Sequence, residues 1–148
     1  TDEAVKTANY DSIDAAAEDG TAFVFMGHGT SHVANVSYDQ MQTQIEQLGY
    51  KNVFIGTVEG EPEETACENV IAAVKEAGYT KVILRPLMVV AGDHANNDMA
   101  GSEEDSHKSI LEKEGIKVET YIHGLGENEA VRNVFVERAN AAWDALEK

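Results

Sequence analysis

Hydrophobic residues in this chain occur in two kinds of run that alternate from one end to the other. Short, nearly continuous apolar runs cover residues 21–26, 52–58, 81–84 and 117–122, and each has the length of a strand buried on both faces. Between these runs, apolar residues recur three and four positions apart, as on one face of a helix. After the first strand these residues are Ala34, Tyr38, Met41, Ile45 and Leu48. The alternation predicts four strand–helix units.

The same spacing predicts four further helices. One covers residues 3–19, one runs from Pro62 to Ala77, and one covers 102–114 with Ser102 and Asp105 as a capping box. The last occupies the C-terminal segment. Its apolar face consists of Val131, Val134, Phe135, Ala139, Ala142, Trp143 and Leu146. A glycine follows each earlier helix, as expected where a helix ends.

The third strand and the segment after it break this regularity. The strand can extend through Val90, but Pro86 cannot donate a ladder hydrogen bond, so we expect a bulge or an early exit from the sheet there. Residues 91–101 (AGDHANNDMAG) form a polar loop of a length that is usually functional in compact domains.

Alternating strands and helices with short turns predict an α/β fold, a three-layer sandwich in which helices cover both faces of a four-stranded parallel sheet. The 148 residues suit one domain with a real core. No apolar run approaches the ~20 residues of a membrane span. One cysteine, Cys67, allows no internal disulfide, which fits a reducing compartment and a cytoplasmic location.

The formal net charge of −16 limits the classes of binding partner that we expect. Nucleic acid and anionic membrane surfaces need basic contacts, so neither is an expected partner. A metal cation is attracted by such a field, although surplus carboxylates also keep a protein soluble.

Chemistry-bearing residues follow each predicted strand. His28 follows the first strand between two glycines, Glu59 follows the second, Asp93 and His94 lie in the loop after the third, and His123 follows the fourth. Carboxyl ends of parallel strands share one edge of the sheet, where such folds bind ligands. Two imidazoles and a carboxylate there suit a divalent transition metal with open coordination positions. The plainer interpretation is a strand-to-helix turn in which His28 bonds locally.

Other known catalytic and nucleotide-binding motifs are incomplete or absent in this sequence. The segment Gly27-x-Gly29 lacks the third glycine of a dinucleotide fingerprint, because His32 stands there, and neither a phosphate loop nor a Gly-x-Ser-x-Gly elbow occurs. We do not expect His28 and His32 to share one metal, since they straddle a glycine turn. Cys67 is expected as a small core residue, His107 as a solvated one and His123 as a turn residue.

Four blocks resemble the anaerobic (class II) sirohydrochlorin cobaltochelatases of the CbiK type, in their C-terminal domain. They are residues 26–30 (MGHGT) with Ala34-Asn35, 56–62 (GTVEGEP), 86–100 (PLMVVAGDHANNDMA), and 124–128 (GLGEN) with Val131-Arg132. The resemblance implies a chelatase-like, flavodoxin-like half and insertion of Co²⁺ into sirohydrochlorin during cobalamin synthesis. It implies His28, Glu59 and His94 as metal ligands, with Glu61 as a rival for the carboxylate position. His28 and His94 are then also the expected catalytic proton acceptors.

Expected substrate contacts surround this set. An apolar wall for the macrocycle comes from Leu87, Met88 and Val89, and a cation for its carboxylates from Arg85. Backbone N–H groups near Gly92 and Gly126 are expected to help bind these carboxylates, and Gly29 and Thr30 complete the expected contacts. Ligand type does not separate Co²⁺ from Ni²⁺ or Fe²⁺.

The resemblance covers one domain, whereas members of the family normally have two similar α/β domains with the tetrapyrrole between them. We therefore expect residues 1–20 to be an N-terminal helix or linker and 21–148 a chelatase C-terminal domain. The partner is then a missing N-terminal domain or a second copy in a homodimer. Two alternatives stay open: a non-catalytic protein that binds metal, haem or tetrapyrrole, and an incomplete chelatase fragment.

Overall fold

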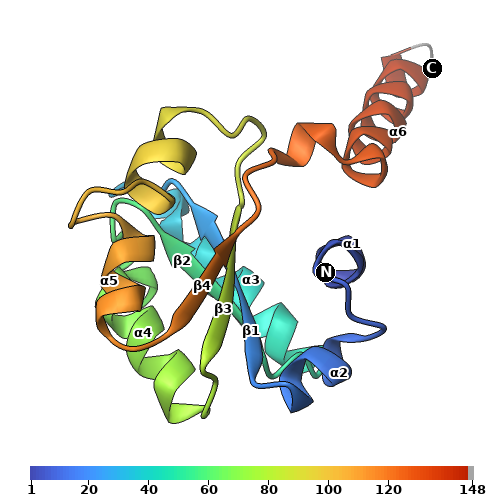
Figure 1. Ribbon diagram of the computed structural model, residues 1–148. Coiled ribbons are helices and arrows are strands. Elements are labelled where there is room, and N and C mark those ends of the chain that lie inside the picture. Colours follow the sequence, from blue (N-terminus) through green and yellow to red (C-terminus); the bar gives the residue numbers. More distant parts are fainter. Residues whose placement is uncertain (147–148) are drawn as a thin grey trace.

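A four-stranded parallel sheet forms the centre of the molecule (Figure 1). The computed structural model describes residues 1–146. The strands are β1 (Thr21–Gly27), β2 (Val53–Thr57), β3 (Lys81–Pro86) and β4 (Lys117–Thr120), in the order β2-β1-β3-β4. The predicted α/β class and all-parallel sheet are confirmed, and the strand order is the start of the flavodoxin-like order.

Helices cover both faces of the sheet, which gives three layers. On one face, Val24, Met26 and Leu84 pack toward α4 (Cys67–Glu76) and α5 (His107–Lys113). On the other face, Phe23 and Ile83 pack toward α1 (Asp2–Thr7), α2 (Ile13–Glu18) and α3 (Val36–Gln47). Because successive strand residues point to opposite faces, the same short apolar runs supply both cores.

The single helix predicted over residues 3–19 is wrong, because the chain forms two short helices, α1 and α2. Between them Asn9 adopts φ 60°, in the left-handed region that asparagine tolerates better than most residues. Ser12 then caps α2 by accepting a hydrogen bond from the Ala15 N–H at 3.0 Å. Ala4, Val5 and Ala16 are buried, so both helices belong to the core.

The segment after β3 is more helical than its polar composition predicts. The chain leaves the sheet after Pro86, as expected, although the Leu87 N–H still donates to the Met26 carbonyl at 2.7 Å. Within the predicted loop, η3 (His94–Met99) is a π-helix. The capping box at Ser102 and Asp105 is wrong: α5 begins at His107, after a cap formed by Ser106, whose hydroxyl accepts from the Ser109 N–H.

The other connections contain short 3₁₀ turns. These are η1 (Val33–Asn35), η2 (Glu63–Thr65) and η4 (Leu125–Glu127). Pro62 therefore precedes η2 and does not begin the long helix, which starts at Cys67.

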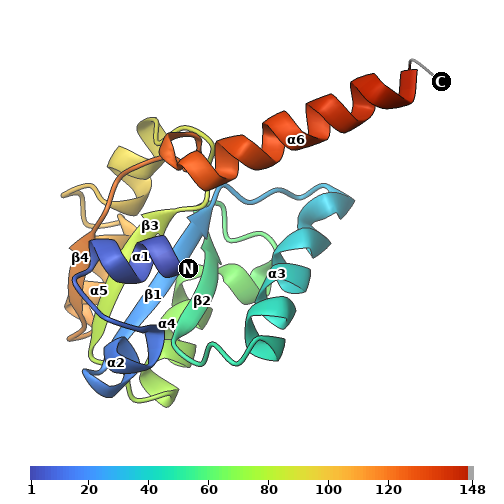
Figure 2. The same cartoon turned by 90° about the vertical axis from the view of Figure 1, so that its right-hand side faces the viewer.

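The C-terminal helix α6 (Glu129–Leu146) extends away from the domain (Figure 2). Its predicted apolar face does not pack on the sheet, and Phe135 and Leu146 are 62% and 83% exposed. Among residues 1–146, no helix combines the length and apolarity needed to cross a membrane.

Candidate metal site

Two site residues come from adjacent strands whose pairing continues past the ends of β1 and β2. The Val58 N–H donates to the Gly27 carbonyl at 3.0 Å, and the Glu59 N–H donates to the His28 carbonyl at 2.9 Å. This ladder places His28 beside Glu59. The order β2-β1-β3-β4 also puts β1 next to the point where the chain switches sides, which is where open α/β sheets bind ligands.

Glycines let the turn after β1 pass close to β2. Gly29 has φ +93°, and a Cβ there would lie 3.0 Å from the Glu59 Cβ and 3.1 Å from the Glu61 carbonyl oxygen. A Cβ on Gly27 would overlap the ring of Tyr38, whose hydroxyl accepts a hydrogen bond from the Gly29 N–H at 3.1 Å. The turn that carries His28 is therefore fixed from both sides.

The third residue of the site, His94, lies on η3. Ala95 and Met99 are fully buried in the core, and this anchors η3 with His94 on its exposed side. The His94 Nε2 lies 3.2 Å from the His28 Nε2, and the two rings meet edge to face with centroids 4.4 Å apart. The Glu59 Oε1 lies 3.8 Å from the His28 Nε2. Ligand atoms of all three residues fall within 4.8 Å of one another.

The hydrogen bonds of the two rings assign their tautomers. The His28 Nδ1 lies 3.0 Å from the Gly29 carbonyl oxygen, and the His94 Nδ1 lies 2.6 Å from the Asp98 Oδ2. Both partners only accept, so each ring carries its proton on Nδ1. When both rings are neutral, each Nε2 then presents a lone pair to the other across 3.2 Å, an arrangement that a cation between them would stabilise. Two metal–nitrogen bonds of about 2.1 Å across the 3.2 Å gap subtend about 100°, as neighbouring ligands of a tetrahedral or octahedral ion do.

The site is open on one side. The side chains of His28, Glu59 and His94 are each about half exposed. Three protein ligands with an open side leave coordination positions for water or substrate, whereas a structural metal site is closed.

The remaining histidines lie outside this group. His32 is exposed and accepts a hydrogen bond from the Ala34 N–H at 3.1 Å, a local role at the start of η1. His107 was expected to be solvated and is instead buried, and its Nδ1 lies 3.1 Å from the Asp98 carbonyl oxygen. His123 pairs with Glu127, its Nδ1 lying 2.7 Å from the carboxylate.

The residues expected to bind substrate divide between two regions. Gly29 and Thr30 follow His28 directly, and the Thr30 N–H donates to the Glu61 carbonyl at 3.4 Å. Val89 and Gly92 are exposed, whereas Leu87 is half-buried and Met88 packs partly on the core. The assignment of these residues stays a prediction.

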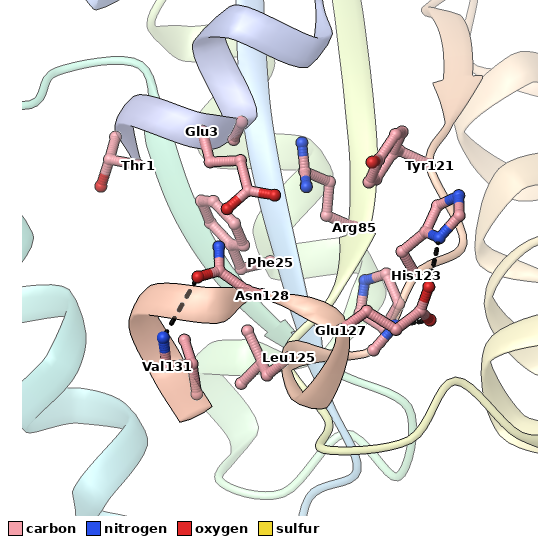
Figure 3. A pocket seen from close by; sticks show the side chains of 13 residues that line it. Thr1, Glu3, Phe25, Arg85, Tyr121, His123, Leu125, Glu127, Asn128 and Val131 are labelled. Atoms are coloured by element: carbon pink, nitrogen blue, oxygen red, sulfur yellow. Dashed lines mark hydrogen bonds and ion pairs between the residues drawn. The ribbon is translucent and has the colours of Figure 1, made fainter. Parts of the chain in front are cut away.

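Arg85 lies elsewhere, in a separate cavity of about 250 Å³ between α1, the end of β3 and η4 (Figure 3). Its guanidinium carbon sits 4.0 Å from the centre of the Tyr121 ring, and it donates a hydrogen bond to Thr7. Burial lowers the pKa of this guanidinium, and the nearby Tyr121 and Glu3 oppose that effect. In the same cavity, hydrogen bonds from His123 and the Gly124 N–H lower the pKa of Glu127. The expected role of Arg85 toward a substrate carboxylate stays a prediction.

Two findings about carboxylates go beyond the sequence. The rival Glu61 does not join the group formed by His28, Glu59 and His94. Asp98, which holds His94, was not anticipated at all. Its position four residues after a histidine is the sequence signal that would have indicated it, had a helix been expected in that segment.

Comparison with known proteins identifies the family of the chain. Residues 2–144 match the family described as Cobalt chelatase (CbiK). A sirohydrochlorin cobaltochelatase from Salmonella typhimurium is 40% identical over 119 residues, which is 80% of this chain and 44% of that protein. The sirohydrochlorin cobaltochelatase CbiKC from Nitratidesulfovibrio vulgaris is 34% identical over 126 residues, or 85% of this chain and 43% of that protein. The chain thus spans less than half the length of these relatives, and it belongs to the CbiK cobalt chelatase family.

Proposed function

We propose that this chain inserts Co²⁺ into sirohydrochlorin, with His28, Glu59 and His94 holding the ion before transfer. The observation that carries the proposal is the pair of Nε2 atoms facing each other at 3.2 Å, each with its Nδ1 already bonded to an acceptor. The names of the two relatives supply the substrate. The metal is a substrate here, so a site that is open and easily vacated suits it.

The reaction exchanges one divalent cation for two pyrrole protons. As Co²⁺ moves to the four macrocycle nitrogens, the two Nε2 atoms lose their metal bonds and become free to take up those protons. Neutral imidazole is suited to this task near pH 7 because its unperturbed pKa is about 6.5. Glu59 supplies negative charge that holds the ion until the macrocycle replaces it. Leu87 and Val89, after β3, are proposed to form the apolar wall against which the ring rests.

We further propose that a second α/β half completes the cleft. The chain covers only 44% and 43% of the two relatives, and the apolar side chains of Phe135 and Leu146 on α6 are exposed. Either an N-terminal domain or a second copy of this chain, related by two-fold symmetry, provides the opposite wall. Light scattering on the purified chain separates these: a homodimer supports the second copy, and a monomer supports the separate domain.

The second half would also explain how a negatively charged chain binds a negatively charged substrate. Sirohydrochlorin is a polycarboxylate, and this chain carries a net charge of −16. Basic groups that bind its carboxylates are therefore proposed to lie mainly on the other half, and Arg85, in its separate cavity, is the contributor proposed from this chain. The assignment of residues 1–20 as an N-terminal helix or linker and of 21–148 as the chelatase C-terminal domain stays a prediction that the full-length gene tests. The cytoplasmic location is a prediction that cell fractionation tests.

A turnover assay with Co²⁺ and sirohydrochlorin tests the proposal. The macrocycle spectrum changes when the metal enters, so product formation is followed directly. His28→Ala is expected to abolish turnover, and His32→Ala, which removes a nearby exposed histidine outside the group, is expected to leave it intact. Stoichiometric binding without metallated product would favour a carrier, and no binding of either substrate would favour an incomplete fragment. Running the assay with Ni²⁺ and Fe²⁺ in competition identifies the preferred metal.

A further inference from the structure

The two histidines of the site are anchored differently. The His28 Nδ1 bonds to a peptide carbonyl, that of Gly29, within its own turn. The His94 Nδ1 bonds to a carboxylate, the Asp98 Oδ2, at the shorter distance of 2.6 Å. A hydrogen bond to an ionised acceptor is shorter and about twice as strong as one between neutral groups. The orientation of His94 therefore depends on one side chain that does not touch the metal position.

The backbone that carries this carboxylate is fixed by buried groups. Met99, the next residue, is fully buried in the core, and the buried His107 bonds through its Nδ1 to the Asp98 carbonyl oxygen. At the end of η3, the Gly101 N–H donates to the Asn97 carbonyl at 2.9 Å, and a Cβ on Gly101 would overlap that oxygen. Asp98 thus projects from a segment with little freedom to move.

We propose that Asp98 is the positioning residue for His94. By accepting a hydrogen bond from the His94 Nδ1–H, it keeps the Nε2 lone pair toward His28 and Glu59, and it holds the ring in that plane. Such outer hydrogen bonds fix the tautomer and the direction of a metal-binding imidazole, and they raise its strength as a ligand. The inference rests on the proposed metal site and adds a residue to it.

A purely local role for Asp98 makes different predictions. An exposed ion pair that only stabilised η3 would affect folding and leave the metal affinity of the folded protein unchanged. A general effect of negative charge would be shared by Asp93, which is exposed, lies next to His94 and makes no side-chain cap to η3.

Calorimetric titration of the 148-residue chain with Co²⁺ separates these roles. Asp98→Ala is expected to weaken Co²⁺ binding by about 10- to 100-fold, the usual cost of losing an outer hydrogen bond to a metal-binding histidine. Asp98→Asn keeps an oxygen that accepts a hydrogen bond from the Nδ1–H, and we expect it to recover much of the affinity. Asp93→Asn is expected to stay within about twofold of the wild type, because salt screens exposed charges. The visible absorption of bound Co²⁺ should change in Asp98→Ala, because the ring then binds in a different orientation or tautomer.

Wild-type affinity in Asp98→Ala would overturn the inference. So would an equal loss in Asp93→Asn, or a fall in melting temperature that parallels the loss of affinity in both Asp98 variants. Absence of Co²⁺ binding by the wild type would contradict the proposed metal site itself, and the inference with it.

Discussion

Replacing Gly29 with alanine tests how closely the turn after β1 must approach β2. Gly29 has φ +93°, where an L-residue other than glycine costs about 1–2 kcal/mol. The new Cβ would also lie 3.0–3.1 Å from three atoms, the Cβ atoms of Glu59 and Thr57 and the Glu61 carbonyl oxygen. Overpacking of this kind typically adds about 1–3 kcal/mol. We therefore expect Gly29→Ala to lower the free energy of unfolding by about 3.5 kcal/mol.

Gly49→Ala provides the matched control. Gly49 has φ +84°, and nothing lies within 4 Å of a Cβ built on it, so this change carries the backbone cost without the contacts. Its expected cost is about 1.5 kcal/mol. At about 3 °C per kcal/mol for a chain of this size, the melting temperature should fall by about 5 °C in Gly49→Ala and about 10 °C in Gly29→Ala.

Differential scanning calorimetry measures both changes, and Co²⁺ titration measures their effect on the site. Only Gly29→Ala should weaken Co²⁺ binding, because only there does the new methyl group push against Glu59. Equal melting temperatures for the two variants, or unchanged Co²⁺ affinity in Gly29→Ala, would refute the argument that this close approach forms the site.

Three further predictions concern single side chains. His94→Ala should reduce Co²⁺ affinity by more than about 100-fold, since it removes a ligand and not only an outer hydrogen bond. Calorimetry should show a change in the free energy of unfolding within about 0.5 kcal/mol, because the side chain is half exposed. A collapse in stability would make His94 a structural residue. The pKa of Glu119 is lowered, first by its hydrogen bond from Lys81. Its ionised form therefore contributes stability above its ordinary pKa, and this stability is lost as the pH falls through the lowered value. Glu119→Gln should lower the melting temperature at pH 7 but not under strongly acidic conditions, and an equal effect at both would contradict the pairing. Burial raises the pKa of the Cys67 thiol to about 11, so a thiol reagent at pH 8 should modify it much more slowly than free cysteine, and a rapid reaction would show that Cys67 is accessible as thiolate.

Sequence patterns located the sheet and nominated all three proposed ligands for a physical reason. The runs that form β1 and β3 are buried on both faces, so they are continuously apolar and easily recognised. Parallel pairing then brings His28 and Glu59 to one edge without any knowledge of side-chain packing. His94 was expected in a loop at the same edge, and that placement needed only the strand end before it.

What the sequence did not reveal depends on tertiary contacts. Residues 94–99 contain Asn96, Asn97 and Asp98, which are weak helix formers, and η3 exists because Ala95 and Met99 are buried. His107 looks solvated in a charged segment, yet it is buried against the Asp98 carbonyl, a partner nine residues away. The apolar face of α6 has the spacing of a packed helix, and spacing does not say whether the covering surface belongs to the same domain.

The central claim is that His28, Glu59 and His94 hold one divalent ion at the carboxyl edge of the sheet. Anomalous diffraction at the cobalt absorption edge, from crystals of this chain soaked in Co²⁺, tests it most directly. The account predicts one strong peak about 2.1 Å from both Nε2 atoms and next to the Glu59 carboxylate. A peak at the His123–Glu127 pair instead, with the two Nε2 atoms left without metal, would contradict it.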